Sequence, residues 1–164
     1  MNEIEFWCDL VSGRFARMVR EEAKGRELNN SREAYHVMKP LVAENHDVET
    51  VYCVFLDGRN RIISIEKMFS GSISSAAIYP REIVKRVIAL KACAVIVAHN
   101  HPSGCTEPSN DDRLITRKIL IALASIDVQL LDHIVVGDSY YSMADSGWIK
   151  SIQEEFKGLL CNQR

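Results

Sequence analysis

The chain has 164 residues, of which 47% are hydrophobic and 26% are charged, as is typical of one globular domain with a buried core. The formal net charge is −2 and the sequence pI is about 6.2, so the composition lacks the basic excess of proteins that bind nucleic acid mainly through phosphate contacts. The five cysteines are scattered and form no CxxC pair, which argues against a disulfide framework and a thiolate zinc cage.

Residues 1–30 are interpreted as a partly helical N-terminal extension ahead of a domain that spans residues 31–164. The opening segment MNEIEFWCDL contains acidic residues and lacks the apolar core of a signal peptide. No apolar run approaches the ~18 residues of a membrane span, so we expect a cytoplasmic protein. Within the extension, residues 13–24 are predicted to form a short helix that ends near Gly25.

The next segments predict a helix and then a β-hairpin. Residues 29–45 have a helical pattern that Asn30 or Ser31 can cap, and Pro40 predicts a kink or a break inside this helix. β-Branched and aromatic residues on both sides of the turn sequence DGRN predict a hairpin over 49–69. This hairpin is a candidate surface for pairing with a second copy of the chain.

The remaining predicted elements alternate between helices and strands. They are a helix over 80–91, a buried strand over 93–99, a helix over 109–124, a β pair over 128–138 and 140–145, and a helix over 148–160. From residue 29 the order is α-β-β-α-β-α-β-β-α, which predicts a mixed-sheet α/β sandwich.

Two histidines follow the apolar strand, within the sequence AVIVAHNHPSGCTEPSNDD at 94–112. Residues two apart on a strand point the same way, so we expect His99 and His101 to present their imidazoles to one point. The turns after His101 let the chain reverse, so that Asp112 on the next helix could complete a His-His-Asp set. Three protein ligands and one open position are typical of a catalytic zinc site, where bound water has a pKa of about 7.

Other interpretations of these residues stay open at this level. An HxH pair is a weak signal by itself. Ser109 and Asp112 also match a capping box, with the serine as N-cap and an acid three residues later. In that case Asp112 serves the helix terminus, and the two roles compete for the same carboxylate oxygens, with Asp111 as a neighbouring acid. Cys105 is a candidate for an additional zinc ligand or an oxidation-sensitive thiol.

The full spacing resembles a known motif. His99-x-His101, then proline, six residues and Ser109-x-x-Asp112, resembles the JAMM motif of MPN-type metalloproteases, H-x-H-P-x6-S-x-x-D. The segments HNHPSG, LLDHIVVGD, VYCVFLDGRNRI and YPREIVKRVI make residues 31–147 similar to the RadC family of bacterial proteins. The resemblance implies an MPN/JAB fold related to the cytidine-deaminase-like sandwiches. It also implies Zn²⁺ held by His99, His101 and Asp112, and hydrolysis of an amide bond in a protein or peptide substrate.

The same resemblance implies a catalytic glutamate on an earlier strand, acting on the water that the metal binds. Glu49 occupies the matching position and is preferred as the base. Glu66 in the hairpin and Glu82 at a helix start are rivals, although an acid at a helix start also suits the helix dipole. Ser109 is expected to donate a hydrogen bond to the developing oxyanion. We therefore expect a JAMM-type metallopeptidase or isopeptidase.

Two more residues have a possible role at this site. Asn100 stands where many JAMM proteases carry serine or threonine, although RadC-like proteins have asparagine there, and this position bears on the substrate class. His133, after Asp132, is expected to be a structural residue or a hydrogen-bonding partner of a metal ligand. The side chains of Asp132 and His133 are not expected to pair, since neighbours on a strand point to opposite faces.

The alternative function is a RadC-like interaction module, linked to DNA repair or mobile elements, with little or no turnover. Full-length RadC proteins carry an N-terminal helix-hairpin-helix region, and the roughly thirty residues that precede the domain here are too few for it, so the chain resembles a short form. DNA association therefore gains no support from the sequence. A zinc deaminase would need H-x-E and a later P-C-x-x-C, and the chain contains neither.

Overall fold

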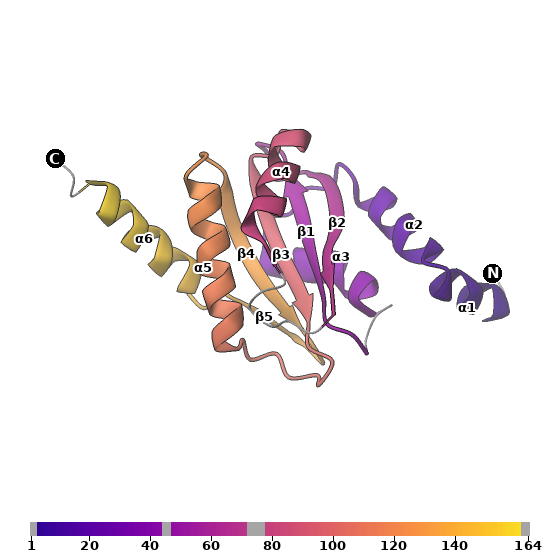
Figure 1. Cartoon of the computed structure of the whole chain (residues 1–164). Coiled ribbons are helices and arrows are strands. Elements are labelled where there is room, and N and C mark those ends of the chain that lie inside the picture. The colour runs from indigo at the N-terminus through magenta and orange to yellow at the C-terminus, as the bar shows by residue number, and fades with distance from the viewer. Residues whose placement is uncertain (1–2, 44–46, 72–77, 162–164) are drawn as a thin grey trace.

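A computed structural model describes residues 3–43, 47–71 and 78–161, and shows one mixed sheet with helices on both faces (Figure 1). The strands are β1 (Thr50–Leu56), β2 (Ile62–Ser70), β3 (Ala94–Asn100), β4 (Gln129–Val136) and β5 (Tyr140–Ser142). The helices are α1 (Glu3–Val11), α2 (Arg14–Ala23), α3 (Ser31–Ala43), α4 (Pro80–Leu90), α5 (Asn110–Ala124) and α6 (Trp148–Cys161). The predicted α/β class is confirmed, and from α3 onward the elements follow the predicted order.

The sheet has the strand order β2-β1-β3-β4-β5. β1 pairs antiparallel with both β2 and β3, β3 pairs parallel with β4, and β4 pairs antiparallel with β5. The parallel pair needs a crossover connection, which α5 supplies. The predicted hairpin is present, and every residue of β1 is buried between its two neighbours. Of the two hairpin strands, β2 lies at an edge of the sheet, where the segment around Glu27 pairs with its start.

The sheet separates two hydrophobic cores because its side chains alternate between the two faces. One core joins the sheet to α2 and α3, and the other joins it to α4, α5 and α6. Figure 1 shows α3 behind the sheet and α4 and α5 in front of it. This covering of both faces explains the nearly continuous apolar sequence of β3. None of the helices in the described part of the chain is long and apolar enough to cross a membrane.

Helix α3 begins at the predicted cap and does not stop at the predicted break. The side-chain oxygen of Asn30 accepts from the backbone N–H of Glu33 at 2.9 Å, which identifies Asn30 as the cap. The helix continues through Pro40 to Ala43, so the predicted break is absent. Proline removes one backbone hydrogen bond, and burial of Leu41 and Val42 in the core offsets that loss.

Two loops meet closely where β3 and β4 end. The backbone N–H of His101 donates to the carbonyl oxygen of Val136 at 2.9 Å, and that of Asp138 donates to Gly104 at 3.1 Å. A Cβ atom at Gly137 would lie 2.3 Å from the carbonyl oxygen of Gly104. Glycine at position 137 therefore allows the loop after β3 to lie against the end of β4, which fixes the place of His101.

Gly137→Ala is expected to lower the free energy of unfolding by about 1–3 kcal/mol, because the added methyl group forces the loop at Gly104 to move. Gly158→Ala is the matched control, since a Cβ there has open space around it. Alanine is the better helix former, so the control is expected to be neutral or stabilising by up to about 1 kcal/mol. Urea unfolding of both variants measures the difference, and equal stabilities would contradict the close approach of the two loops.

Candidate metal centre

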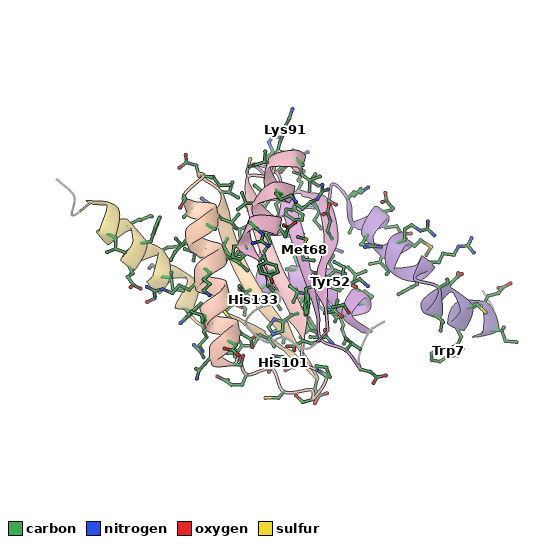
Figure 2. The ribbon with its side chains drawn as sticks, viewed as in Figure 1. Trp7, Tyr52, Met68, Lys91, His101 and His133 are labelled. Atoms are coloured by element: carbon green, nitrogen blue, oxygen red, sulfur yellow. The ribbon has the colours of Figure 1, made fainter. Side chains whose placement is uncertain are left out.

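Four polar side chains from separate elements meet at the end of β3. His99 lies in β3, His101 follows it, Asp112 lies in the first turn of α5, and Glu49 directly precedes β1. One ligand atom from each side chain lies within 4.8 Å of all the others. These are the residues that the sequence predicts as three ligands and a base. Figure 2 shows His101 near the loop that leads to α5, and His133 further along the sheet.

The strand pairing explains why Glu49 belongs to this group. Val51 pairs with His99 across the antiparallel β1–β3 ladder. Two residues earlier on one strand and two later on the other, Glu49 and His101 lie opposite each other on the same face. That face is covered by α5, which brings Asp112 to the histidines. The sheet and one helix thus place all four side chains.

The ligand atoms converge on a single point. The Nε2 atoms of His99 and His101 are 3.0 Å apart. Asp112 places Oδ1 3.2 Å from the Nε2 of His99 and Oδ2 3.3 Å from the Nε2 of His101. Imidazole nitrogens and carboxylates that face one point need a positive charge between them, and this donor set suits a divalent metal ion. The four residues therefore fit a metal site.

His101 is oriented by a main-chain carbonyl. Its Nδ1 lies 2.7 Å from the carbonyl oxygen of Cys105. A carbonyl oxygen only accepts, so Nδ1 carries the hydrogen, and Nε2 of the neutral ring keeps the lone pair that faces Asp112. When Nε2 is also protonated, it donates to Asp112, and this hydrogen bond raises the pKa of His101 above its ordinary value, although burial opposes this effect. Cys105 contributes its carbonyl oxygen here, and its thiol does not belong to the group of ligand atoms.

Asp112 serves the helix terminus and the cluster together. Its Oδ2 accepts from the backbone N–H of Ser109 at 2.8 Å, while its own N–H donates to the Ser109 hydroxyl at 3.0 Å. The capping box is therefore present, and the same carboxylate faces both histidines. Capping the helix and facing the histidines therefore do not exclude each other, contrary to expectation, because the two carboxylate oxygens have enough lone pairs for both. Burial raises the pKa of Asp112, but the facing imidazoles of His101 and His99 and the hydrogen bond from the Ser109 backbone outweigh burial and hold this pKa well below its ordinary value.

Of the three glutamates considered as a base, the structure places Glu49 beside the histidines. Its Oε1 lies 3.9 Å from the Nε2 of His99 and 3.8 Å from that of His101. Both oxygens of Glu66 instead bind the guanidinium of Arg86, at 2.6 and 2.7 Å. Glu82 lies in the first turn of α4 and pairs with a lysine one turn later.

Asn100, between the two histidines, holds the main chain on both sides of Glu49. Its Oδ1 accepts from the backbone N–H of Thr50 at 2.7 Å, and its Nδ2 donates to the carbonyl oxygen of Val48 at 3.0 Å. From the sequence, Asn100 is expected only to bear on the substrate class. The structure instead shows that Asn100 fastens the segment that carries Glu49 to the strand that carries the histidines.

A third imidazole lies behind His99. The Nε2 of His133 is 2.8 Å from the Nδ1 of His99, and the Nδ1 of His133 is 2.5 Å from the hydroxyl of Thr116. The sequence indicates a role for His133 but not for Thr116. The only sequence feature that points to Thr116 is its position one helical turn after Asp112, on the same face of α5. The carboxylate of Asp132 binds Ser142 on the neighbouring strand, away from the imidazole of His133.

Comparison with known proteins identifies relatives over most of this chain. The model of the RadC-like JAB domain matches residues 28–148. A UPF0758 protein of Vibrio atlanticus is 54% identical over 102 residues, which cover 62% of this chain and 46% of that protein. A UPF0758 protein of Burkholderia thailandensis is 46% identical over 134 residues, which cover 81% of this chain and 51% of that protein. The chain spans about half the length of the curated relatives it matches.

Titration of the purified chain with zinc is expected to give about one tightly bound ion. His101→Ala should weaken zinc binding by more than the 10- to 100-fold that is typical for loss of an outer hydrogen-bond partner, because it removes one of the expected ligands. His36→Ala is the control, since His36 is exposed on α3. Isothermal titration calorimetry measures the affinity and the stoichiometry. A His101→Ala variant that binds zinc like the His36→Ala variant would remove His101 from the metal site.

The ion pair of Glu66 and Arg86 predicts a pH-dependent stability. Hydrogen bonds from Arg86 lower the pKa of Glu66, so the pair stabilises the fold above the unfolded-state pKa of about 4.3, and this contribution is lost as pH falls through the lower folded-state pKa. Glu66→Gln should therefore cost about 0.5–1 kcal/mol near neutral pH, since the pair is partly exposed, and the cost should shrink as the pH approaches about 3.

Urea unfolding of wild type and Glu66→Gln across this pH range measures the effect. Zinc affinity should stay unchanged in Glu66→Gln, because Glu66 binds Arg86 and not the histidines. A loss of zinc binding in this variant would mean that Glu66 belongs to the metal site.

Proposed function

Because this chain belongs to the RadC-like JAB domain family, we propose that it is a zinc-dependent hydrolase that cleaves an amide bond, as a metallopeptidase or isopeptidase. The observation that carries this proposal is the convergence of Glu49, His99, His101 and Asp112 on one point. The substrate would be a peptide or a protein, since these supply the amide bonds that such a site attacks.

The donor set supports zinc as the metal. His99 and His101 would each supply a nitrogen and Asp112 an oxygen, and three protein ligands with an open position are typical of catalytic zinc. When bound, zinc lowers the pKa of a water at the open position to about 7 and polarises a carbonyl oxygen. The low pKa of Asp112 keeps its carboxylate charged at neutral pH, as a metal ligand must be.

Glu49 is the proposed general base. Its carboxylate lies too far from both imidazoles to hydrogen-bond to them, and close enough to reach a water molecule between them. The side chain of Glu49 is 20% exposed and that of His101 16% exposed, whereas His99 and Asp112 are buried, so substrate would approach from the side of Glu49. There Glu49 would take a proton from the attacking water and deliver it to the leaving amine.

Ser109 is the proposed donor to the developing oxyanion. Its hydroxyl oxygen accepts from the backbone N–H of Asp112 and uses a lone pair to do so, which leaves the hydroxyl hydrogen for another partner. The residue is exposed at the start of α5, three positions before the proposed ligand Asp112. Loss of one such donor typically lowers the rate by about 10²–10³-fold.

Glu49→Gln is expected to keep zinc while losing turnover by about 10²–10⁴-fold, since an amide cannot accept the proton. The assay is cleavage of internally quenched peptides and of lysine-linked isopeptides by the zinc-loaded full chain. Glu66→Gln is the matched control, because it removes a carboxylate that binds Arg86 instead of facing the histidines.

Two outcomes would count against this proposal. A Glu49→Gln variant as active as wild type would exclude Glu49 from the reaction. A zinc-loaded wild type that cleaves none of the peptides and isopeptides would overturn the hydrolase and favour the alternative of an interaction module.

A further inference from the structure

A continuous chain of hydrogen bonds runs behind the candidate metal centre and returns to it. It leads from Nδ1 of His99 to Nε2 of His133 (2.8 Å), from Nδ1 of His133 to the Thr116 hydroxyl (2.5 Å), and from that hydroxyl to the main-chain carbonyl of Asp112 (2.5 Å). All four residues are at most 2% exposed. The chain therefore connects two of the three proposed ligands through the protein interior.

The last acceptor fixes the direction of the two bonds of the Thr116 hydroxyl, and the neutral form of His133 then fixes the third. The carbonyl oxygen of Asp112 only accepts, so the Thr116 hydroxyl gives its single hydrogen to that oxygen. The hydroxyl must then accept from His133, whose Nδ1 carries a hydrogen. A neutral His133 keeps a lone pair at Nε2, and His99 must donate to it from Nδ1.

The surroundings of His133 favour its neutral form. Its two ring nitrogens contact a hydroxyl and another imidazole, and neither is a carboxylate that would compensate a buried cation. His99 therefore has its hydrogen on Nδ1 and its lone pair on Nε2, the atom that faces Asp112 and His101.

We propose that His133 and Thr116 are positioning residues, which hold His99 in the tautomer and the ring orientation that a metal ligand requires. The inference rests on the metal site of the proposed function, and it concerns metal binding instead of turnover. Outer hydrogen-bond partners of a ligand imidazole typically account for a 10- to 100-fold difference in metal affinity.

The fold supplies both positioning residues from the face that carries the ligands. His133 pairs with Val97 across the parallel β3–β4 ladder, and His99 is the next residue of β3 on the same face. Thr116 follows Asp112 by one turn of α5 and points to the same side. Thr116, which orients His133, and the proposed ligand Asp112 therefore come from one helix.

The first test reads the hydrogen positions. In the full chain with ¹⁵N-labelled histidine, long-range ¹⁵N–¹H correlation spectra distinguish protonated from unprotonated ring nitrogens. We expect His133 to carry its hydrogen on Nδ1 and to have an unprotonated Nε2, both with and without zinc. A His133 that carries a hydrogen on Nε2 would overturn the proposal, because it could not accept from His99.

The second test measures zinc affinity by competition with a chromophoric chelator. His133→Phe removes the acceptor but keeps a ring, and Thr116→Val removes the hydroxyl but keeps the shape of the side chain. Both are expected to raise the Kd for zinc by about 10- to 100-fold. Thr116→Ser keeps the hydroxyl and should stay close to wild type, as should His36→Phe, which removes an exposed histidine.

The pattern across these variants separates positioning from packing. Equal losses of affinity in Thr116→Ser and Thr116→Val would indicate packing and overturn the proposal, as would wild-type affinity in Thr116→Val. Circular dichroism checks that each variant folds, and Thr116→Val decides the question if His133→Phe does not fold. A wild type that binds zinc without turnover would contradict only the proposed hydrolase activity. Unchanged zinc affinity in His133→Phe and Thr116→Val would contradict only the positioning role.

Discussion

The antiparallel pairing of β1 with β3 is the constraint on which the rest of the site depends. It sets Val51 opposite His99, and thereby Glu49 opposite His101. A shift of one residue would turn every side chain of one strand to the other face, where it would enter the core under α2 and α3. The register is secured because both faces of these strands are buried, so the hydrophobic core that stabilises the sheet also fixes the relative places of the proposed base and the proposed ligands.

The cluster of Glu49, His99, His101 and Asp112 contains a buried carboxylate, and hydrogen bonds offset the cost of burying its charge. Burial of an uncompensated carboxylate is costly, but Asp112 accepts from the backbone of Ser109 while it faces His99 and His101. The positive end of the α5 dipole lies at the same place and favours a negative charge there. The first turn of one helix therefore stabilises the carboxylate that faces the two imidazoles.

The sequence predicted the elements well from α3 onward, because periodicity, turn chemistry and caps are local signals. The sequence also predicted the residues of the cluster. Glu49 could be preferred over Glu66 only through the resemblance to the RadC family, since local sequence does not determine strand register. The contact of His133 with His99 depends on the β3–β4 ladder, whose register shifts between Val95 and Ile96. No local pattern gives that shift. Of the kink or break predicted at Pro40, the break is absent, since tertiary packing outweighed a local rule.

Asn100, the middle residue of the HxH motif, has a structural role through its side-chain amide. Its oxygen and nitrogen bind two peptide groups, one on each side of Glu49, and so tie the segment that carries the proposed base to the strand that carries the imidazoles. Serine or threonine offers a single oxygen on a shorter arm and cannot occupy both positions. Proteins with a hydroxyl there must anchor the preceding strand by other means. Among related proteins, a change of residue 100 would therefore indicate a different anchoring of the segment around Glu49, even where the substrate preference is the same.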